Sequence, residues 1–159
     1  LADVLLASES DGDKVAWADH DTYMLHLMQM DEGVKEIVQR EDVQRLLADV
    51  DDCKLDVFML ETATDGRSLE IVGLRSLADI GCIEDFALDT KRLCRFLAEI
   101  GHGGQQGPFH NAMRSATAAH VVQWLIQRGG LGHVLDATHK LALVLSALIL
   151  ECQVARGAC

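Results

Sequence analysis

The sequence predicts an all-α fold, and three observations point to it. Apolar residues recur at steps of three and four along most of the chain, which is the spacing of one helix face. Glycines directly follow several of these apolar runs, as a helix C-cap requires. The chain contains only one proline, which favours helices over a turn-rich β-sandwich. No stretch predicts a strand convincingly.

The composition is that of a folded domain with an acidic surface. Apolar residues make up 49% of the 159 residues and charged residues 25%, which argues against disorder. The chain contains 14 basic and 25 acidic residues, so its net charge is −11. This balance disfavours nucleic acid and anionic membrane surfaces as partners, because both require basic patches.

Cysteine usage, the lack of a signal-peptide pattern and the short length of the apolar runs indicate a cytoplasmic setting. The five cysteines are odd in number and contain no C-x-x-C, which is typical of reduced thiols. The first residues lack the pattern of a signal peptide. The longest apolar run, residues 141–150, is too short to cross a bilayer.

Residues 31–50 carry the first helical pattern. Apolar clusters recur there at helical steps, and the pattern leaves open whether a break near Arg40 divides it into two helices. Residues 51–54 form a short connector. Residues 55–60 then predict another one or two helical turns.

Turn and capping signals divide the middle of the chain. Residues 64–66, Thr-Asp-Gly, predict a turn, and the helix after it is expected to stop at Gly81. Asp89 is a good N-cap for the next helix. Gly101 is expected to end that helix in the same way as Gly81.

Two further helices follow a glycine- and glutamine-rich loop at residues 102–107. The first covers residues 111–128, with Asn111 as its N-cap, and closes at a Gly-Gly pair, and Asp136 caps the second. The centre of the second, residues 141–150, is apolar on nearly every side. Such a helix is normally enclosed by others, so we expect further helices to cover it and the domain to be incomplete at its C-terminal end.

Three stretches, in order along the chain, carry a resemblance to a known family. The first is LDVFMLE at residues 55–61, followed by DGRSL and VG; the second is LCRFL at 93–97, followed by PFHN; the third is LALVLSAL at 141–148. Together they resemble the catalytic domain of the class I 3′,5′-cyclic nucleotide phosphodiesterases. The resemblance implies a compact multi-helix domain of the HD type. It divides the chain into a helical N-terminal extension at residues 1–50 and the N-terminal part of a phosphodiesterase-like catalytic domain at 51–159.

The resemblance also implies a catalytic site in which a two-metal centre activates a hydroxide and a histidine acts as general acid. That histidine falls on His110, followed by Asn111, and the metal-ligand positions fall on Arg114, Leu150 and Glu151. A guanidinium has no lone pair for a metal, leucine has no ligand atom, and one carboxylate does not hold a catalytic metal. We therefore expect no metal ligands, no cofactor and an idle His110; zinc or magnesium would be needed only for an active enzyme.

Two roles for Arg114 remain open at this level. With Asn111 it could bind the phosphate of a nucleotide. The favoured alternative is a buried salt bridge with Glu151, which would replace a metal as the link between two helices. The histidine pairs His20/His26 and His133/His139 are spaced six residues apart, which does not place both members on one helix face.

The leading functional hypothesis is a catalytically inactive phosphodiesterase-like domain that serves as a structural or interaction subunit of a larger assembly. Its expected partners are other proteins or the remainder of its own chain, in a cytoplasmic, cytoskeletal or ciliary setting. One alternative is metal-dependent hydrolysis of cAMP or cGMP, with the site completed by residues outside this chain. Another is nucleotide sensing without hydrolysis.

Overall fold

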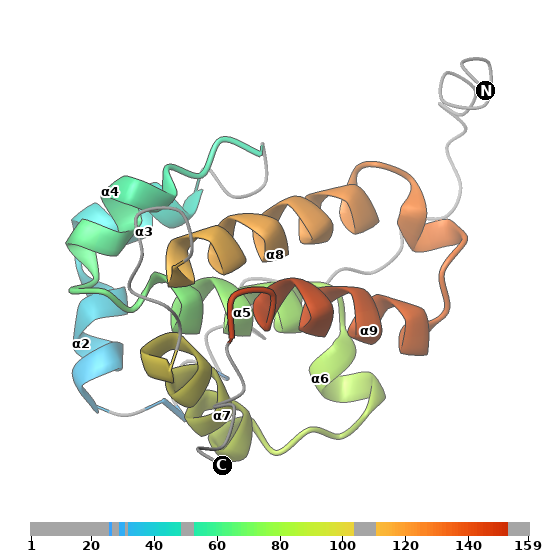
Figure 1. Cartoon of the computed structure of the whole chain (residues 1–159), viewed down its shortest axis with the longest axis horizontal. Helices are drawn as coiled ribbons and strands as arrows, with labels where there is room; N and C mark the ends of the chain where they lie inside the picture. Colours follow the sequence, from blue (N-terminus) through green and yellow to red (C-terminus); the bar gives the residue numbers. More distant parts are fainter. Residues whose placement is uncertain (1–25, 27–28, 31, 49–52, 104–110, 153–159) are drawn as a thin grey trace, which may run out of the picture.

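A computed structural model of the chain describes residues 26, 29–30, 32–48, 53–103 and 111–152. Every regular element in these ranges is helical, which confirms the predicted all-α class. The predicted domain boundary at residue 50 lies outside the described residues and stays a prediction. The helices, shown in Figure 1, are α2 (Glu32–Gln39), α3 (Glu41–Ala48), α4 (Val57–Ala63), α5 (Ser68–Asp79), α6 (Cys82–Asp85), α7 (Thr90–Gly103), α8 (Ala112–Gln127), the 3-10 helix η2 (Leu131–His133) and α9 (Ala137–Leu148).

The region before the connector forms two helices, which resolves the question that the sequence left open. Arg40 lies between α2 and α3, and each helix buries two apolar residues one turn apart. The side-chain nitrogen of Gln44 donates to the carbonyl oxygen of Val38 at 2.6 Å. This contact ties the start of α3 to the last turn of α2.

Helix α5 forms the centre of the fold, with α7, α8 and α9 packed around it (Figure 1). Nearly all of its residues are buried. A Cβ atom added at Gly73 would lie 2.8 Å from Leu97 Cδ2 of α7 and 3.0 Å from Leu148 Cδ2 of α9. The glycine of the VG pair therefore allows three helices to approach closely at one point.

Most of the local signals are confirmed. Gly81 has φ +77° directly after α5. The side chains of Asp89 and Asp136 accept backbone N–H groups of their helices' first turns, at 2.8 Å and 2.9 Å. The expected stop at Gly101 is wrong, because α7 continues to Gly103. Gly101 lacks a positive φ; a Cβ there would sit 3.9 Å from Leu69 Cδ2, so it packs against α5 instead of capping.

Two short elements escaped the sequence pattern. Helix α6 has four residues and η2 has three, so neither is long enough to show a helical period.

Helix α8 ends as predicted near the glycine pair, with Gly130 at φ +80°. Among the described residues no helix combines the length and apolarity needed to cross a membrane.

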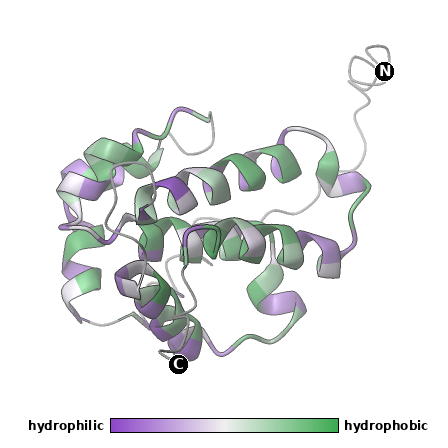
Figure 2. Cartoon of the chain, viewed as in Figure 1, coloured by the Kyte–Doolittle hydropathy of each residue, from purple (hydrophilic) through white to green (hydrophobic). Residues whose placement is uncertain are grey.

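The described part of the chain covers α9 on one face only, and the expectation that further helices cover the rest stays a prediction. Val144, Ala147 and Leu148 are buried against α5 and α8, whereas Leu143 is 40% exposed and Ile149, directly after the helix, is 46% exposed. Figure 2 shows α9 hydrophobic along its central turns. Residues 141–150 are apolar on nearly every side, but their neighbours in the described structure cover only one face of the helix.

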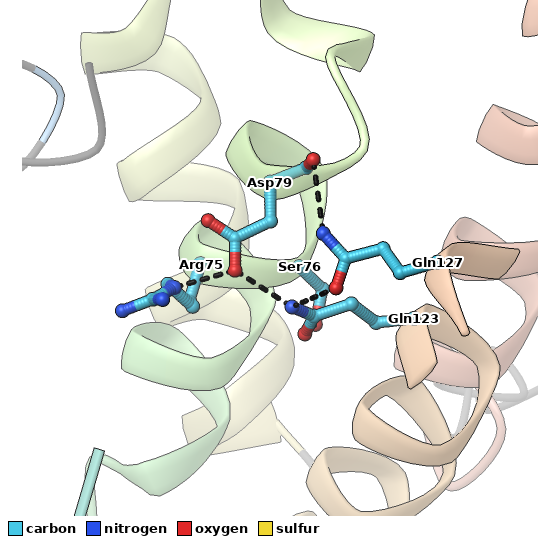
Figure 3. Close-up of polar contacts among 5 residues, drawn as sticks. All are labelled: Arg75, Ser76, Asp79, Gln123 and Gln127. Carbon is cyan, nitrogen blue, oxygen red and sulfur yellow. Dashed lines mark hydrogen bonds and ion pairs between the residues drawn. The ribbon is translucent and has the colours of Figure 1, made fainter. Parts of the chain in front are cut away.

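A buried polar cluster joins α5 to α8 (Figure 3). The carboxylate of Asp79 accepts from Arg75 Nε at 2.5 Å and from Gln123 Nε2 at 2.7 Å. Ser76 Oγ donates to Gln123 Oε1 at 2.9 Å, and Gln127 Nε2 donates to the carbonyl oxygen of Asp79 at 3.1 Å. Hydrogen bonds of this kind offset the cost of burying polar groups and fix how the two helices align.

Candidate functional site

The predicted site residues gather at the N-terminus of α8. Asn111 is the N-cap, and its side-chain oxygen accepts from the backbone N–H of Arg114 at 3.2 Å. This confirms the predicted capping role of Asn111. Because the cap fixes the first helical turn, it also fixes the position from which the Arg114 side chain extends.

Arg114 and Glu151 form the predicted ion pair. Arg114 Nε lies 3.3 Å from Glu151 Oε1. The backbone N–H of Glu151 also donates to Ser115 Oγ at 3.2 Å. Two adjacent contacts therefore tie the residues after α9 to the first turn of α8.

The ion pair is buried on one side only. The Glu151 side chain is 10% exposed, whereas the Arg114 side chain is 54% exposed. The carboxylate thus depends on protein partners for its solvation, while water reaches much of the arginine. The guanidinium held there offsets the charge of a nearly buried carboxylate.

Three of the predicted residues also share a cavity. Asn111, Arg114 and Leu150 line a space of about 670 Å³ whose other walls are formed mostly by apolar side chains of α4 and α8. Leu150 is 53% exposed there and offers no ligand atom. Phe58 of α4, 74% exposed, stands at the same cavity.

No cluster of three or more histidine, cysteine, aspartate or glutamate side chains in the described ranges could hold a metal ion. His110 falls within residues 104–110 and His20 within residues 1–25, both outside the described residues. The roles assigned to His110 by resemblance therefore stay predictions. Arg114 and Asn111 as phosphate ligands likewise stay predictions.

Sequence reasoning missed several contacts of this region. The sequence pattern assigns no role to Ser115, yet its hydroxyl oxygen accepts a hydrogen bond from the backbone N–H of Glu151. His26, which the sequence presents only as one member of a histidine pair, lies 2.8 Å from Glu84 Oε1 through Nε2 and 3.1 Å from Thr90 Oγ1 through Nδ1. A single sequence gives no signal for such contacts between residues far apart in the chain.

The described residues form an all-helical domain, as the resemblance to the class I 3′,5′-cyclic nucleotide phosphodiesterases implies. The curated relatives of this chain are 3′,5′-cyclic nucleotide phosphodiesterases, as its motifs predict. Over 109 residues it is 31% identical to the dual specificity calcium/calmodulin-dependent 3′,5′-cyclic nucleotide phosphodiesterase 1B of Bos taurus, a match covering 67% of this chain and 20% of that protein. It is 29% identical over 105 residues to the 1C enzyme of Homo sapiens, covering 65% of this chain and 15% of that protein.

A more distant relative extends the same relationship. The probable 3′,5′-cyclic phosphodiesterase pde-1 of Caenorhabditis elegans is 24% identical over 110 residues, covering 68% of this chain and 17% of that protein. The matched part of the chain therefore spans 15–20% of the length of these curated relatives. No protein-family model matches it. No solved structure matches it either.

Proposed function

We propose that this chain is a phosphodiesterase-like domain in which an ion pair replaces the metal centre, and that it acts by protein contacts instead of hydrolysis. The observation that carries the proposal is the 3.3 Å contact between Arg114 Nε and Glu151 Oε1. Both residues fall on positions where the family resemblance expects metal ligands. The guanidinium charge would repel a dication at this distance, and its nitrogens cannot coordinate one.

Leu150 supports the same conclusion from the neighbouring position. Its side chain contributes an apolar wall to the cavity where the resemblance implies a ligand. A hydroxide-generating metal requires at least three protein ligands of the histidine or carboxylate type. Glu151 is the one residue of that type among the three ligand positions, and it already faces a cation.

The proposed contact surface is the outer face of α9. Leu143 and Ile149 leave about half of their side chains in contact with water on a helix whose other face is buried. Covering such a face with apolar side chains stabilises an assembly by about 25 cal/mol for each Å² removed from water. A subunit of a larger assembly, or the remainder of a longer chain, would supply that cover.

Sedimentation velocity tests this contact. The chain with an uncovered α9 face is expected to self-associate, and the double substitution Leu143→Glu/Ile149→Glu is expected to return it to a monomer. Val134→Glu is the matched control, because Val134 is 81% exposed and lies outside α9. A wild-type chain that sediments as a clean monomer, or equal effects of the two variants, would contradict the proposed surface.

Two other functions have a specific observation in their favour. Hydrolysis of cyclic nucleotides is what the names of the relatives describe, and a site completed by residues outside this chain would provide it. Nucleotide sensing is favoured by the shared cavity of Asn111 and Arg114, whose volume lies in the range of small-molecule sites. Metal-dependent turnover identifies the first, and saturable binding of cAMP or cGMP without turnover identifies the second.

A further inference from the structure

A second cavity lies beside α2, α5 and α7, away from the Arg114–Glu151 pair. It measures about 550 Å³, and three basic side chains line it: Lys35 of α2, and Lys91 and Arg95 of α7. Glu70 of α5 lines the same cavity and is only 4% exposed. A cluster of cations over a buried carboxylate is unusual in a chain of net charge −11.

Basic side chains outnumber acidic ones among the described residues that line this cavity. Lys91 and Arg95 are four residues apart on α7, so they lie on one side of the helix, where like charges repel. Lys35 adds a third cation from α2, held at 2.7 Å by Glu32, which does not line the cavity. Among the described residues that line the cavity, three cations accompany one carboxylate, that of Glu70, and this excess of positive charge favours an anionic ligand.

We propose that this cavity binds a small phosphate-bearing molecule that also carries a hydroxyl group. Lys91, Arg95 and Lys35 would contact the phosphate oxygens, since a guanidinium fork and an ammonium both suit phosphate geometry. Glu70 would accept a hydrogen bond from the hydroxyl, because a carboxylate has room for several donors. The cavity volume falls within the range of about 300–1,000 Å³ that is usual for small-molecule sites.

Isothermal titration calorimetry of the whole 159-residue chain at low salt tests the proposal, with glycerol 3-phosphate, inorganic phosphate and glycerol as probes. Glycerol 3-phosphate should bind more tightly than inorganic phosphate, and glycerol should not bind. Arg95→Gln should weaken the binding of glycerol 3-phosphate about tenfold, the loss expected for one charged hydrogen bond. Arg92→Gln is the matched control: Arg92 is an exposed cation on the same helix but does not line the cavity.

A second variant tests the role of the carboxylate. Glu70→Gln should reduce the preference for glycerol 3-phosphate over inorganic phosphate while leaving phosphate binding in place. Lys91→Gln replaces Arg95→Gln if circular dichroism shows that the latter does not fold. Absence of binding by the wild type, or equal losses in Arg92→Gln and Arg95→Gln, would overturn the proposal. These outcomes are independent of the proposed function, which concerns α8 and α9.

Discussion

Arg114 Nε lies 3.3 Å from Glu151 Oε1, and this pair joins the first turn of α8 to the residues that follow α9. By the family resemblance, both positions correspond to metal ligands of the phosphodiesterases. The link between the two helices is therefore made by a fixed cation on the chain itself. It needs no bound ion, and it is expected to persist when metals are removed.

The ion pair should contribute measurably to stability. Arg114→Ala removes the cation that lies 3.3 Å from the Glu151 carboxylate, which is 10% exposed. We expect the free energy of unfolding to fall by about 1–3 kcal/mol, the usual cost of losing a hydrogen-bonded contact to a charged, largely buried group. Urea denaturation followed by circular dichroism measures this change.

An exposed ion pair provides the control for that experiment. Arg45 and Glu41 are 3.2 Å apart, but both side chains are more than four-fifths exposed. Arg45→Ala should change stability by no more than about 0.5 kcal/mol, as for other surface pairs on helices. If Arg114→Ala changed the free energy of unfolding as little as Arg45→Ala, the Arg114–Glu151 ion pair would not stabilise the fold.

Gly73 should tolerate no side chain. A Cβ atom there would meet Leu97 Cδ2 at 2.8 Å and Leu148 Cδ2 at 3.0 Å, so Gly73→Ala is expected to cost about 1–3 kcal/mol by overpacking. Gly103→Ala, where a Cβ would meet nothing within 4 Å, should cause no loss. Thermal melting of the two variants compares them directly, and an unchanged melting temperature for Gly73→Ala would contradict the close packing of α5, α7 and α9.

The buried cluster between α5 and α8 should be sensitive to its central amide. Gln123→Leu removes the donor to Asp79 Oδ2 and the acceptor for Ser76 Oγ, both of which are buried. We expect a loss of about 1–3 kcal/mol in the free energy of unfolding, because buried polar groups lose their partner. Gln127→Leu, at the partly exposed edge of the cluster, should cost less. A larger loss for Gln127→Leu than for Gln123→Leu in urea denaturation would show that Gln123 is not the centre of the cluster.

Stability should fall at alkaline pH because of one thiol. Burial, and secondarily the charge of Asp85, raises the pKa of Cys82 from 9.0 to about 11. In the unfolded chain this thiol ionises near its ordinary pKa, so between about pH 9 and 11 the unfolded state loses a proton that the folded state keeps. The protonated thiol therefore adds its full share to the free energy of unfolding below about pH 9. This share is lost as the pH rises from about 9 to 11, by no more than about 1.4 kcal/mol for each pH unit.

Comparison of the wild type with Cys82→Ala isolates this titration from that of lysine and tyrosine. The free energy of unfolding of the wild type should decrease more steeply between pH 9 and 11 than that of the variant. Identical slopes would show that the Cys82 thiol does not keep its proton in the folded chain.

Local signals account for the part of the fold that the sequence predicts well. Asp89, Asn111 and Asp136 each cap a helix through a hydrogen bond to a residue three positions on, so the neighbouring sequence alone reveals them. Gly81 is equally local, because its positive φ follows from its place after the last apolar residue of α5. Gly101 shows the limit of this reasoning, because it packs against Leu69 of α5 and does not cap α7.

The candidate site is less completely predictable from the sequence, for a physical reason. The Arg114–Glu151 pair can be anticipated because the family resemblance brings the two positions together. Ser115, Phe58 and the two cavities depend on the relative placement of whole helices, which no periodic pattern encodes. The exposure of Leu143 on α9 has the same origin: hydropathy predicts what a helix can bury, whereas its neighbours decide what it does bury.

The central claim, that an ion pair has replaced a catalytic metal centre, is tested most directly by hydrolysis of cAMP and cGMP. The assay uses the 159-residue chain with added Mg²⁺, Mn²⁺ or Zn²⁺, and His110→Ala as the control for the general acid implied by the resemblance. We predict no metal-dependent turnover in either protein. Metal-dependent turnover by the wild type that is lost in His110→Ala would contradict the claim and show that other residues complete a working site.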